Sequence, residues 1–275
     1  MMLEYPIDLG TWLSYKPYHD SEQLEEQKSA LLSLDIYNGS GQIRFIYTKY
    51  LASLNDYLEG LVPQIKVVNI TTVLENEIYY TAKIEGAKTT RKRTSELRNG
   101  APIDENSAYS EYMVKNAFEA TKLMNLYGNK LHAFKLRNVW EILTNNCCVN
   151  ESIKGELFRT GNVSIGQYDA PDYTLVPSLI TSWLQFYASE ILDEKPFIKA
   201  AILHFAFETI HPFCDGNGRM GRMLINNYLI GRGIDSARAV SFSMQIDKTR
   251  AKYDVAFADA ENIMNDCTPF IVYIC

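Results

Sequence analysis

The chain has 275 residues, of which 47% are hydrophobic and 22% are charged. This balance is typical of a globular protein with its own buried core, and it excludes a disordered chain. The net charge of -6 and the pI near 5.4 argue against a general nucleic-acid binder, because such proteins bind by neutralising phosphates with lysine and arginine. The N-terminal sequence has no signal-peptide pattern, and no stretch approaches the ~18 apolar residues of a membrane span. We therefore expect a cytoplasmic protein without membrane contact.

Residues 1–65 are predicted to be a helical region of unknown role. The segment 21–34 is charged and helical in pattern, and the segment 44–58 repeats aromatic and aliphatic residues at helical spacing up to the stop at Gly60. The rest of the chain, 66–275, is expected to form one mainly α-helical domain with a small β element.

A helix is predicted from Thr71 or Thr72, either of which offers an N-cap, to Gly86, which stops it. The basic run 88–98 that follows is interpreted as a solvated face. β-formers between turn residues over 159–168 predict a short hairpin. Further helices are predicted in three segments: 109–124, 133–143 and 179–192.

A glycine-bearing loop is predicted between two apolar helices in the last third of the chain. Pro196 stands at the first position of a helix that ends near His211, because Pro212 disfavours helical geometry in the residue before it. The loop then leads into a helix that starts at about Met220. A helix N-terminus has free backbone N–H groups and the positive end of the dipole, and glycines let a phosphate approach. This pattern predicts an anion site.

Side chains in and after this loop complete a candidate active site. Arg219 and Arg222 lie three residues apart on one helical face, so both can point at one polyphosphate. Asp215 supplies a hard oxygen ligand of the kind that Mg²⁺ takes. His211 has an ordinary pKa of about 6.5, which suits a general base. A base, a metal ligand and a phosphate cradle thus fall within one short segment.

The residues from His211 to Arg222 read HPFCDGNGRMGR. They resemble the motif HPFx(D/E)GNGRxxR of the Fic (Fido) family at every defined position, and the resemblance extends from about Thr71 to Ile274. It implies a Fic-type helical bundle with a short β-hairpin flap over residues 66–275. It also implies an Mg²⁺-dependent protein adenylyltransferase, which transfers AMP from ATP to a Ser, Thr or Tyr hydroxyl of a target protein.

The resemblance also implies roles for single residues. His211 deprotonates the target hydroxyl, and Asp215 holds Mg²⁺ against the phosphates of ATP. The residues that contact the phosphates are Gly216, Asn217, Gly218, Arg219 and Arg222. Tyr253 belongs to the adenine pocket, but Asp254 follows it where many relatives have a second tyrosine, and Glu261 or Asn262 stands for an asparagine that meets the adenine. The base preference is therefore left open. The flap aligns the target by strand addition through Val163, Ser164 and Ile165.

The residues from Thr81 to Gly86 read TAKIEG and resemble the family's inhibitory motif, (S/T)xxxE(G/N). The helix 71–86 is then an inhibitory helix within the same chain. Glu85 is expected to pair with Arg222 and to deny this arginine to the γ-phosphate. Relatives often associate near this helix, which leaves a homodimer open.

Two other functions stay open. In some relatives the inhibitory glutamate positions a water molecule, so the same residues could remove AMP from a protein. A nucleotide-binding regulatory protein with little turnover is the second, although binding alone does not require His211. His204 is interpreted as a core residue, because it lies near the apolar stripe of its helix.

The five cysteines form an odd set without CxxC spacing: Cys147, Cys148, Cys214, Cys267 and Cys275. Such a set predicts neither a disulfide framework nor a zinc site, so we expect reduced and mostly buried thiols. Cys214 is interpreted as a packing residue rather than a nucleophile.

Overall fold

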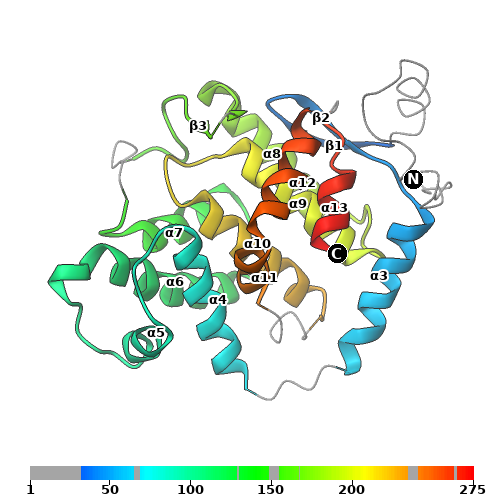
Figure 1. The fold of residues 1–275 in the computed structure, drawn as a ribbon. Coiled ribbons are helices and arrows are strands. Elements are labelled where there is room, and N and C mark those ends of the chain that lie inside the picture. The colour runs from blue at the N-terminus through cyan, green and yellow to red at the C-terminus, as the bar shows by residue number, and fades with distance from the viewer. Residues whose placement is uncertain are drawn as a thin grey trace.

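The computed structural model describes residues 32–64, 69–128, 130–148, 155–166, 168–234, 241–262 and 265–275 (Figure 1). The fold is mainly α-helical, as predicted. The helices are α3 (Lys49–Leu61), α4 (Ile70–Ile84), α5 (Arg91–Arg98), α6 (Ala108–Tyr127), α7 (Ala133–Thr144), α8 (Val176–Ala188), α9 (Pro196–Ile210), α10 (Asn217–Gly231), α11 (Phe242–Lys248), α12 (Arg250–Asn262) and α13 (Thr268–Ile274). Two antiparallel hairpins are formed by β1 (Leu32–Asn38) with β2 (Gly41–Phe45) and by β3 (Ser164–Ile165) with β4 (Tyr168–Asp169).

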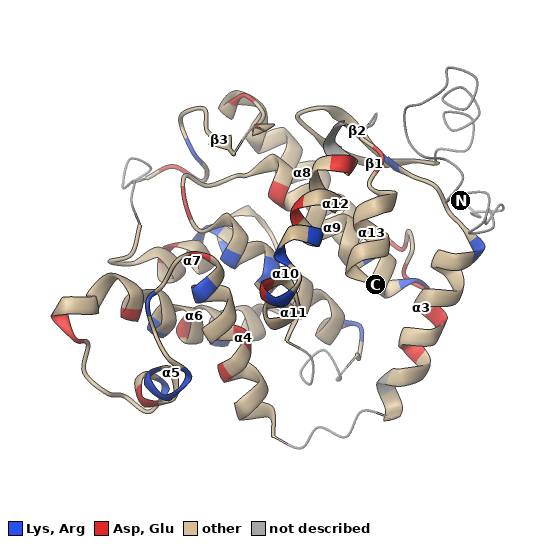
Figure 2. Cartoon of the chain, in the orientation of Figure 1, with Lys and Arg blue, Asp and Glu red and all other residues tan. Residues whose placement is uncertain are grey.

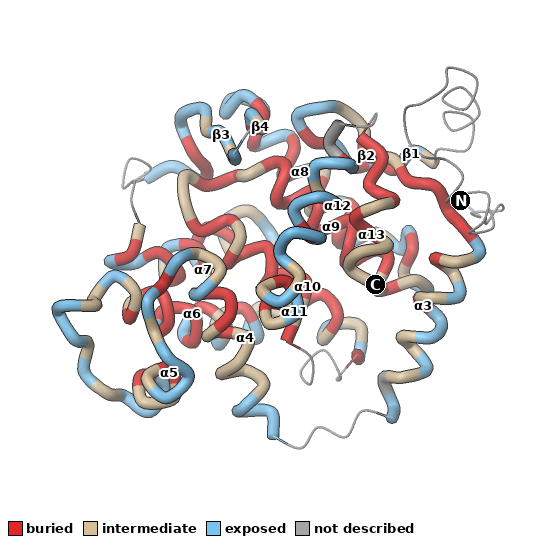
Figure 3. Tube along the Cα trace, in the orientation of Figure 1, coloured by how far each residue is buried: buried red, intermediate tan, exposed pale blue. Residues whose placement is uncertain are grey.

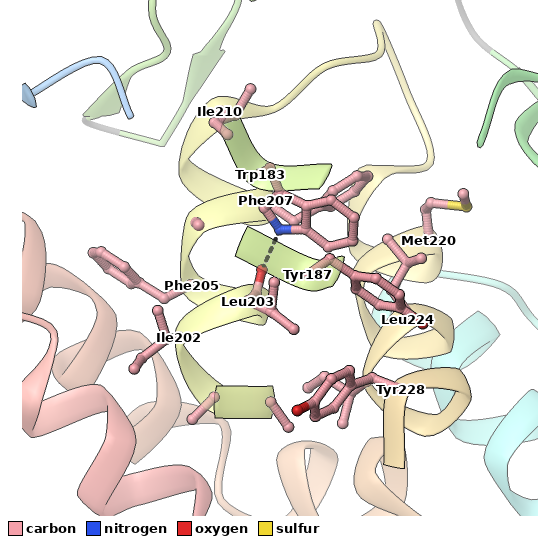
Figure 4. Close-up of a cluster of buried hydrophobic side chains, with 14 of the residues drawn as sticks. Trp183, Tyr187, Ile202, Leu203, Phe205, Phe207, Ile210, Met220, Leu224 and Tyr228 are labelled. Carbon is pink, nitrogen blue, oxygen red and sulfur yellow. Dashed lines mark hydrogen bonds between the residues drawn. The ribbon is translucent and has the colours of Figure 1, made fainter. Parts of the chain in front are cut away.

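The helix α9 forms the centre of the core (Figure 3). Its residues are buried all round except Phe197, as expected for a helix that is apolar on every face. Trp183 from α8 donates a hydrogen bond to the carbonyl of Leu203 at 2.8 Å, and Tyr228 from α10 lies in the same cluster (Figure 4). The buried helix thereby holds the loop at its C-terminal end in a fixed place.

The prediction of a helical region over residues 1–65 is wrong where the structure describes β1 and β2. Leu34 and Ile36 are buried and alternate with exposed residues, which is the period of a strand rather than of a helix. The predicted helix over 44–58 begins only at α3. The segment 1–31 lies outside the described residues. The hairpin packs in the same core as α8 and α9, because apolar residues on one face of a two-stranded sheet need a partner.

The helix α4 starts earlier than the threonine caps predict. The Asn69 side chain caps it by accepting a hydrogen bond from the Thr72 N–H at 3.1 Å, since a short amide side chain suits this position. The stop is confirmed, because Gly86 has a φ of 85° directly after the helix. The helix α8 also starts earlier than predicted, with Pro177 in its first turn, where a missing N–H costs nothing.

The basic run on α5 lies on an exposed part of the molecule (Figure 2). Arg93 pairs with Glu111 of α6 at 2.7 Å, and Arg98 pairs with Glu75 of α4 at 2.5 Å. These contacts join α5 to its neighbours. Among the described helices, none combines the length and the apolar composition needed to cross a membrane.

Candidate active site

The loop between α9 and α10 forms the candidate site. His211 ends α9 with a left-handed φ of 50°, and Gly216 with a φ of 77° starts α10. The helix α10 therefore begins at Asn217, three residues before the predicted start. A side chain at Gly216 would lie 2.9 Å from the Thr144 methyl group, so only glycine fits this turn. No side chain caps the first turn of α10.

The side chain of Asn217 shapes this loop. It accepts a hydrogen bond from the Phe213 N–H at 2.9 Å and donates one to the Phe213 carbonyl at 2.7 Å. Phe213 stacks on Trp140 of α7, with ring centroids 5.1 Å apart, and the Trp140 indole N–H donates to the Asp215 carbonyl at 2.8 Å. The structure thus places Asn217 as a brace within the loop, a contact that the sequence analysis did not foresee.

Arg159 holds the histidine end of the loop, and sequence reasoning gave it no role. Its N–H donates to the Pro212 carbonyl and its Nε to the His211 carbonyl, both at 2.9 Å. The same buried side chain also donates to the carbonyls of Gly161 and Pro171. The sequence carries no signal for this role, because it does not reveal that this arginine is buried among backbone carbonyls.

The imidazole of His211 is oriented by the preceding turn. Its Nδ1 lies 3.2 Å from the Glu208 carbonyl. A proton on Nδ1 can be donated to that carbonyl, which leaves Nε2 as the acceptor. Burial lowers the pKa of His211 to about 4. The imidazole is therefore neutral at neutral pH and able to take a proton.

The two arginines of α10 do not face a common point in this structure. Arg219 donates to the Leu143 carbonyl at 3.3 Å and lies 3.6 Å from the Asp215 carboxylate. Its Nε and Nη2 have no hydrogen-bond partner among the described residues, although the side chain is buried. A buried guanidinium of this kind calls for an acceptor such as a phosphate oxygen.

Arg222 faces α4 instead. Its Nη2 donates to the Glu85 carboxylate at 2.6 Å, and its Nε donates to the Thr81 hydroxyl at 2.8 Å. Burial raises the pKa of Glu85. The charge and hydrogen bond of Arg222, together with the charges of Arg219 and Arg250, outweigh this effect, so the pKa is lowered and the carboxylate is ionised. A side chain at Gly218 would lie 2.4 Å from the Glu85 oxygen, so this glycine permits the contact.

A buried polar cluster lies behind Arg222. The Tyr253 hydroxyl is 3.2 Å from Nε2 of His204, whose pKa burial lowers to about 3. His204 is therefore a core residue, as predicted, and the Tyr253 hydroxyl already has a partner within the protein. A side chain at Gly221 would lie 2.1 Å from a Glu208 oxygen, so the carboxyl fills the space that glycine leaves. Asp254 pairs with Arg250, and the side chains of Glu261 and Asn262 lie outside the described residues.

Replacing Glu208 by glutamine should remove a pH-dependent loss of stability. Burial raises the pKa of this carboxyl from 4.5 to about 7, so between these values the unfolded chain is ionised and the folded one is protonated. Glu208 contributes ~3 kcal/mol to the free energy of unfolding through this difference in pKa. The contribution is complete below the unfolded pKa and is lost as pH rises through the folded pKa. Urea unfolding of both proteins from about pH 5 to about pH 8 measures the difference. Equal losses in both would show that Glu208 is not the titrating group.

A hairpin is confirmed close to the predicted range 159–168, where β3 pairs with β4. Ser164 pairs with Asp169, and Ile165 pairs with Tyr168. The Tyr168 hydroxyl donates to the Thr209 carbonyl of α9 at 3.3 Å, which ties the hairpin to the helix that carries the histidine. The Val163 carbonyl accepts the Ala170 N–H at 3.1 Å.

The helix α4 is clamped to α11 at two points. The Glu77 carboxylate accepts hydrogen bonds from the Ser241 hydroxyl at 2.7 Å and from the Ser243 N–H and hydroxyl at 3.0 and 2.5 Å. Lys83 pairs with Asp247 at 2.7 Å. Glu77 thereby satisfies the first turn of α11 and fixes α4 above Arg222.

A cavity of about 260 Å³ lies on another side of α4, between α4, α6, α7 and α10. Its wall is mostly apolar and includes Leu74 and Ile78 of α4 and Met223 of α10. Thr81, which holds Arg222, is also part of this wall. The helix that carries Glu85 is therefore incompletely packed on this side.

Comparisons with known proteins show what this chain is similar to in sequence. Residues 130–229 match the model of the Fic/DOC family. Protein adenylyltransferase fic-1 of Caenorhabditis briggsae is 26% identical over 203 residues, which are 72% of this chain and 38% of that protein. Protein adenylyltransferase Fic of Aedes aegypti is 29% identical over 161 residues, 57% of this chain and 32% of that protein. The chain thus spans well under half the length of these relatives.

Solved structures share the fold. A Fic family protein from Desulfovibrio desulfuricans G20 has a TM-score of 0.68 at 22% identity, over 82% of this chain and 69% of that one. Fic-1 from C. elegans has a TM-score of 0.63 at 20% identity, over 95% of this chain and 75% of that one. The matched family segment contains the complete motif from His211 to Arg222. On this evidence, residues 130–229 are similar in sequence to the Fic/DOC family, and the chain shares the fold of solved Fic proteins.

Proposed function

We propose that the chain is a protein adenylyltransferase that moves AMP from ATP to a hydroxyl of a target protein and that Glu85 inhibits it. The observation that carries the proposal is the loop at the start of α10, where a neutral histidine lies beside an uncapped helix N-terminus and two buried arginines. The names of the relatives from C. briggsae and A. aegypti support the same reaction. Residues 66–275 would form the catalytic domain.

The phosphates of ATP would lie at the start of α10. The backbone around Gly216, Asn217 and Gly218 and the dipole of α10 favour an anion there. Arg219 offers Nε and Nη2, which form one fork that matches two phosphate oxygens. Arg222 would hold a further phosphate once Glu85 leaves it. Tyr253 would border the base.

Asp215 fits the part of a Mg²⁺ ligand. Its side chain is partly exposed, and no three His, Cys, Asp or Glu side chains converge on a cation within the described residues. Mg²⁺ typically takes one or two carboxylates together with substrate phosphates, so one aspartate suits it. When bound, the ion would neutralise charge on the phosphates.

Proton transfer falls to His211. The Nδ1 contact with the Glu208 carbonyl leaves Nε2 to accept the proton of the target hydroxyl as that oxygen attacks the α-phosphate. Arg219 and Arg222 would stabilise charge on the departing pyrophosphate. The edge of β3, with Val163, Ser164 and Ile165, would align the target segment by strand pairing.

The ion pair between Glu85 and Arg222 would suppress this reaction. While α4 stays clamped to α11, Arg222 donates to Glu85 and Thr81 and is not available to the γ-phosphate. ATP then binds without the contact that places its α-phosphate near His211. Movement of α4 would restore activity.

The test compares ATP labelled on the α-phosphate with ATP labelled on the γ-phosphate, using Glu85→Gly, Mg²⁺ and a cell lysate as the source of targets. AMP transfer predicts protein-bound label from the α-phosphate only, with the γ-label released in pyrophosphate. Protein-bound label from the γ-phosphate alone would overturn the proposal. A protein that releases AMP from a modified target and never attaches it would be a hydrolase instead.

A further inference from the structure

Three of the five cysteines gather at the loop of the candidate site. The Cys214 thiol, within the motif, is hydrogen-bonded to the Cys148 thiol, which follows α7. The neighbouring Cys147 donates to the Leu143 carbonyl at 3.4 Å and accepts from Arg219 at 3.5 Å. None of these thiols has a part in the proposed transfer reaction.

The two segments that carry Cys148 and Cys214 are already held together by other contacts. The Trp140 indole of α7 donates to the carbonyl of Asp215, the residue after Cys214, at 2.8 Å. At the end of α7, the Thr144 methyl group lies 2.9 Å from the place of a side chain at Gly216. The packing of α7 against the loop therefore keeps the segments that carry the two thiols close together.

The exposure of the thiols separates this pair from two of the others. Cys148 and Cys214 are both partly exposed, whereas Cys147 and Cys267 are buried. Cys275 is partly exposed as well but lies at the C-terminal end of α13. An oxidant can reach the pair, and Cys275 offers a matched thiol away from the loop.

We propose that Cys148 and Cys214 form a dithiol site that oxidises to a disulfide and that this disulfide lowers AMP transfer at the loop. The oxidant is a low-molecular-weight disulfide such as oxidised glutathione. One protein thiolate attacks it, releases one glutathione thiolate and forms a mixed disulfide. The second protein thiolate then attacks that bond and releases the second glutathione. Two protein thiols lose their protons and two electrons, and two glutathione thiols gain them.

Closing the disulfide changes the loop. Hydrogen-bonded sulfur atoms must approach to the ~2 Å of a covalent bond, which pulls residue 214 toward the end of α7. Asp215 and His211 lie on either side of this residue in the same loop. A displacement of about 1 Å in such a site can lower the rate by about 100-fold. The loss of activity rests on the proposed function, whereas the disulfide does not.

The experiment treats the full chain with oxidised glutathione and maps cysteine pairs by digestion and mass spectrometry without reductant. A Cys148–Cys214 peptide that dithiothreitol removes is expected in wild type, in Glu85→Gly and in Cys275→Ser. In Cys148→Ser it must be absent. A bond between Cys147 and Cys148, or glutathione retained on single thiols, would overturn the proposal.

Activity is measured in parallel as AMP transfer by Glu85→Gly. Oxidation should lower transfer by at least about 10-fold, dithiothreitol should restore it, and adding Cys148→Ser should abolish the effect. If the disulfide forms and transfer is unchanged, the switch is overturned although the pair exists. If Glu85→Gly transfers no AMP before oxidation, the proposed function fails, and the mapped disulfide still decides the dithiol site.

Discussion

Glu85→Gly is expected to raise AMP transfer by about 10- to 100-fold. The carboxylate of Glu85 takes one charge-assisted hydrogen bond from Arg222 at 2.6 Å. Such a bond contributes about 1.5–3 kcal/mol, which corresponds to that range of rates if the γ-phosphate takes its place. The measurement is incorporation of α-labelled AMP into protein at saturating ATP.

Two variants distinguish the effect of the Glu85 charge from a general effect of changing α4. Glu85→Gln keeps the size of the side chain and removes the charge, so it should raise transfer by less than glycine does. Glu75→Gln removes another carboxylate of α4, one that pairs with Arg98 of α5 and not with Arg222. It should leave transfer unchanged. Equal activity of wild type and Glu85→Gly, with ATP bound by both, would contradict the inhibitory role.

His211→Ala in the Glu85→Gly background is expected to lower transfer by about 10²- to 10⁴-fold, the usual effect of losing a general base. Binding of ATP should change little, because the proposed phosphate contacts come from the start of α10 and its arginines and not from the His211 side chain. Transfer and nucleotide binding are measured on the same preparation. His132→Ala, an exposed histidine before α7, is the matched control.

The pH dependence supplies a second readout for His211. Because burial lowers its pKa to about 4, the imidazole stays a competent base well below its ordinary value of 6.5. Transfer by Glu85→Gly should therefore fall only as pH drops toward about 4. A fall centred near 6.5 would show that the base is exposed in the active form or is another group.

Much of the site could be predicted because its signals are local. Pro196 marks the start of α9, Pro212 marks its end, and Gly216 marks the turn that precedes α10. The pairing of Glu85 with Arg222 also followed from two short motifs. These parts depend on residues near one another in sequence or on a resemblance that covers them.

The other contacts of the site join segments that are far apart in the chain, and a single sequence does not show which distant segments meet. Arg159 acts through four backbone carbonyls, and nothing around it in sequence marks a buried arginine. Glu77 meets Ser241 and Ser243 only because α4 packs on α11. The hairpin of β1 and β2 is different, because apolar and polar residues alternate in the sequence from Leu32 to Ile36, which is the period of a strand.

We expect the form in which Glu85 contacts Arg222 to be the larger of the two in volume, because a cavity lies beside α4 in this form. Its space of about 260 Å³ lies against the helix that carries Glu85, and movement of α4 would close it or let water enter. Pressure favours the state of smaller total volume, because voids that vanish reduce the volume of the system. Hydrostatic pressure should therefore activate the wild type relative to Glu85→Gly. The proposed inhibition by Glu85 would then weaken under pressure, through the packing of α4 and not through any residue of the loop.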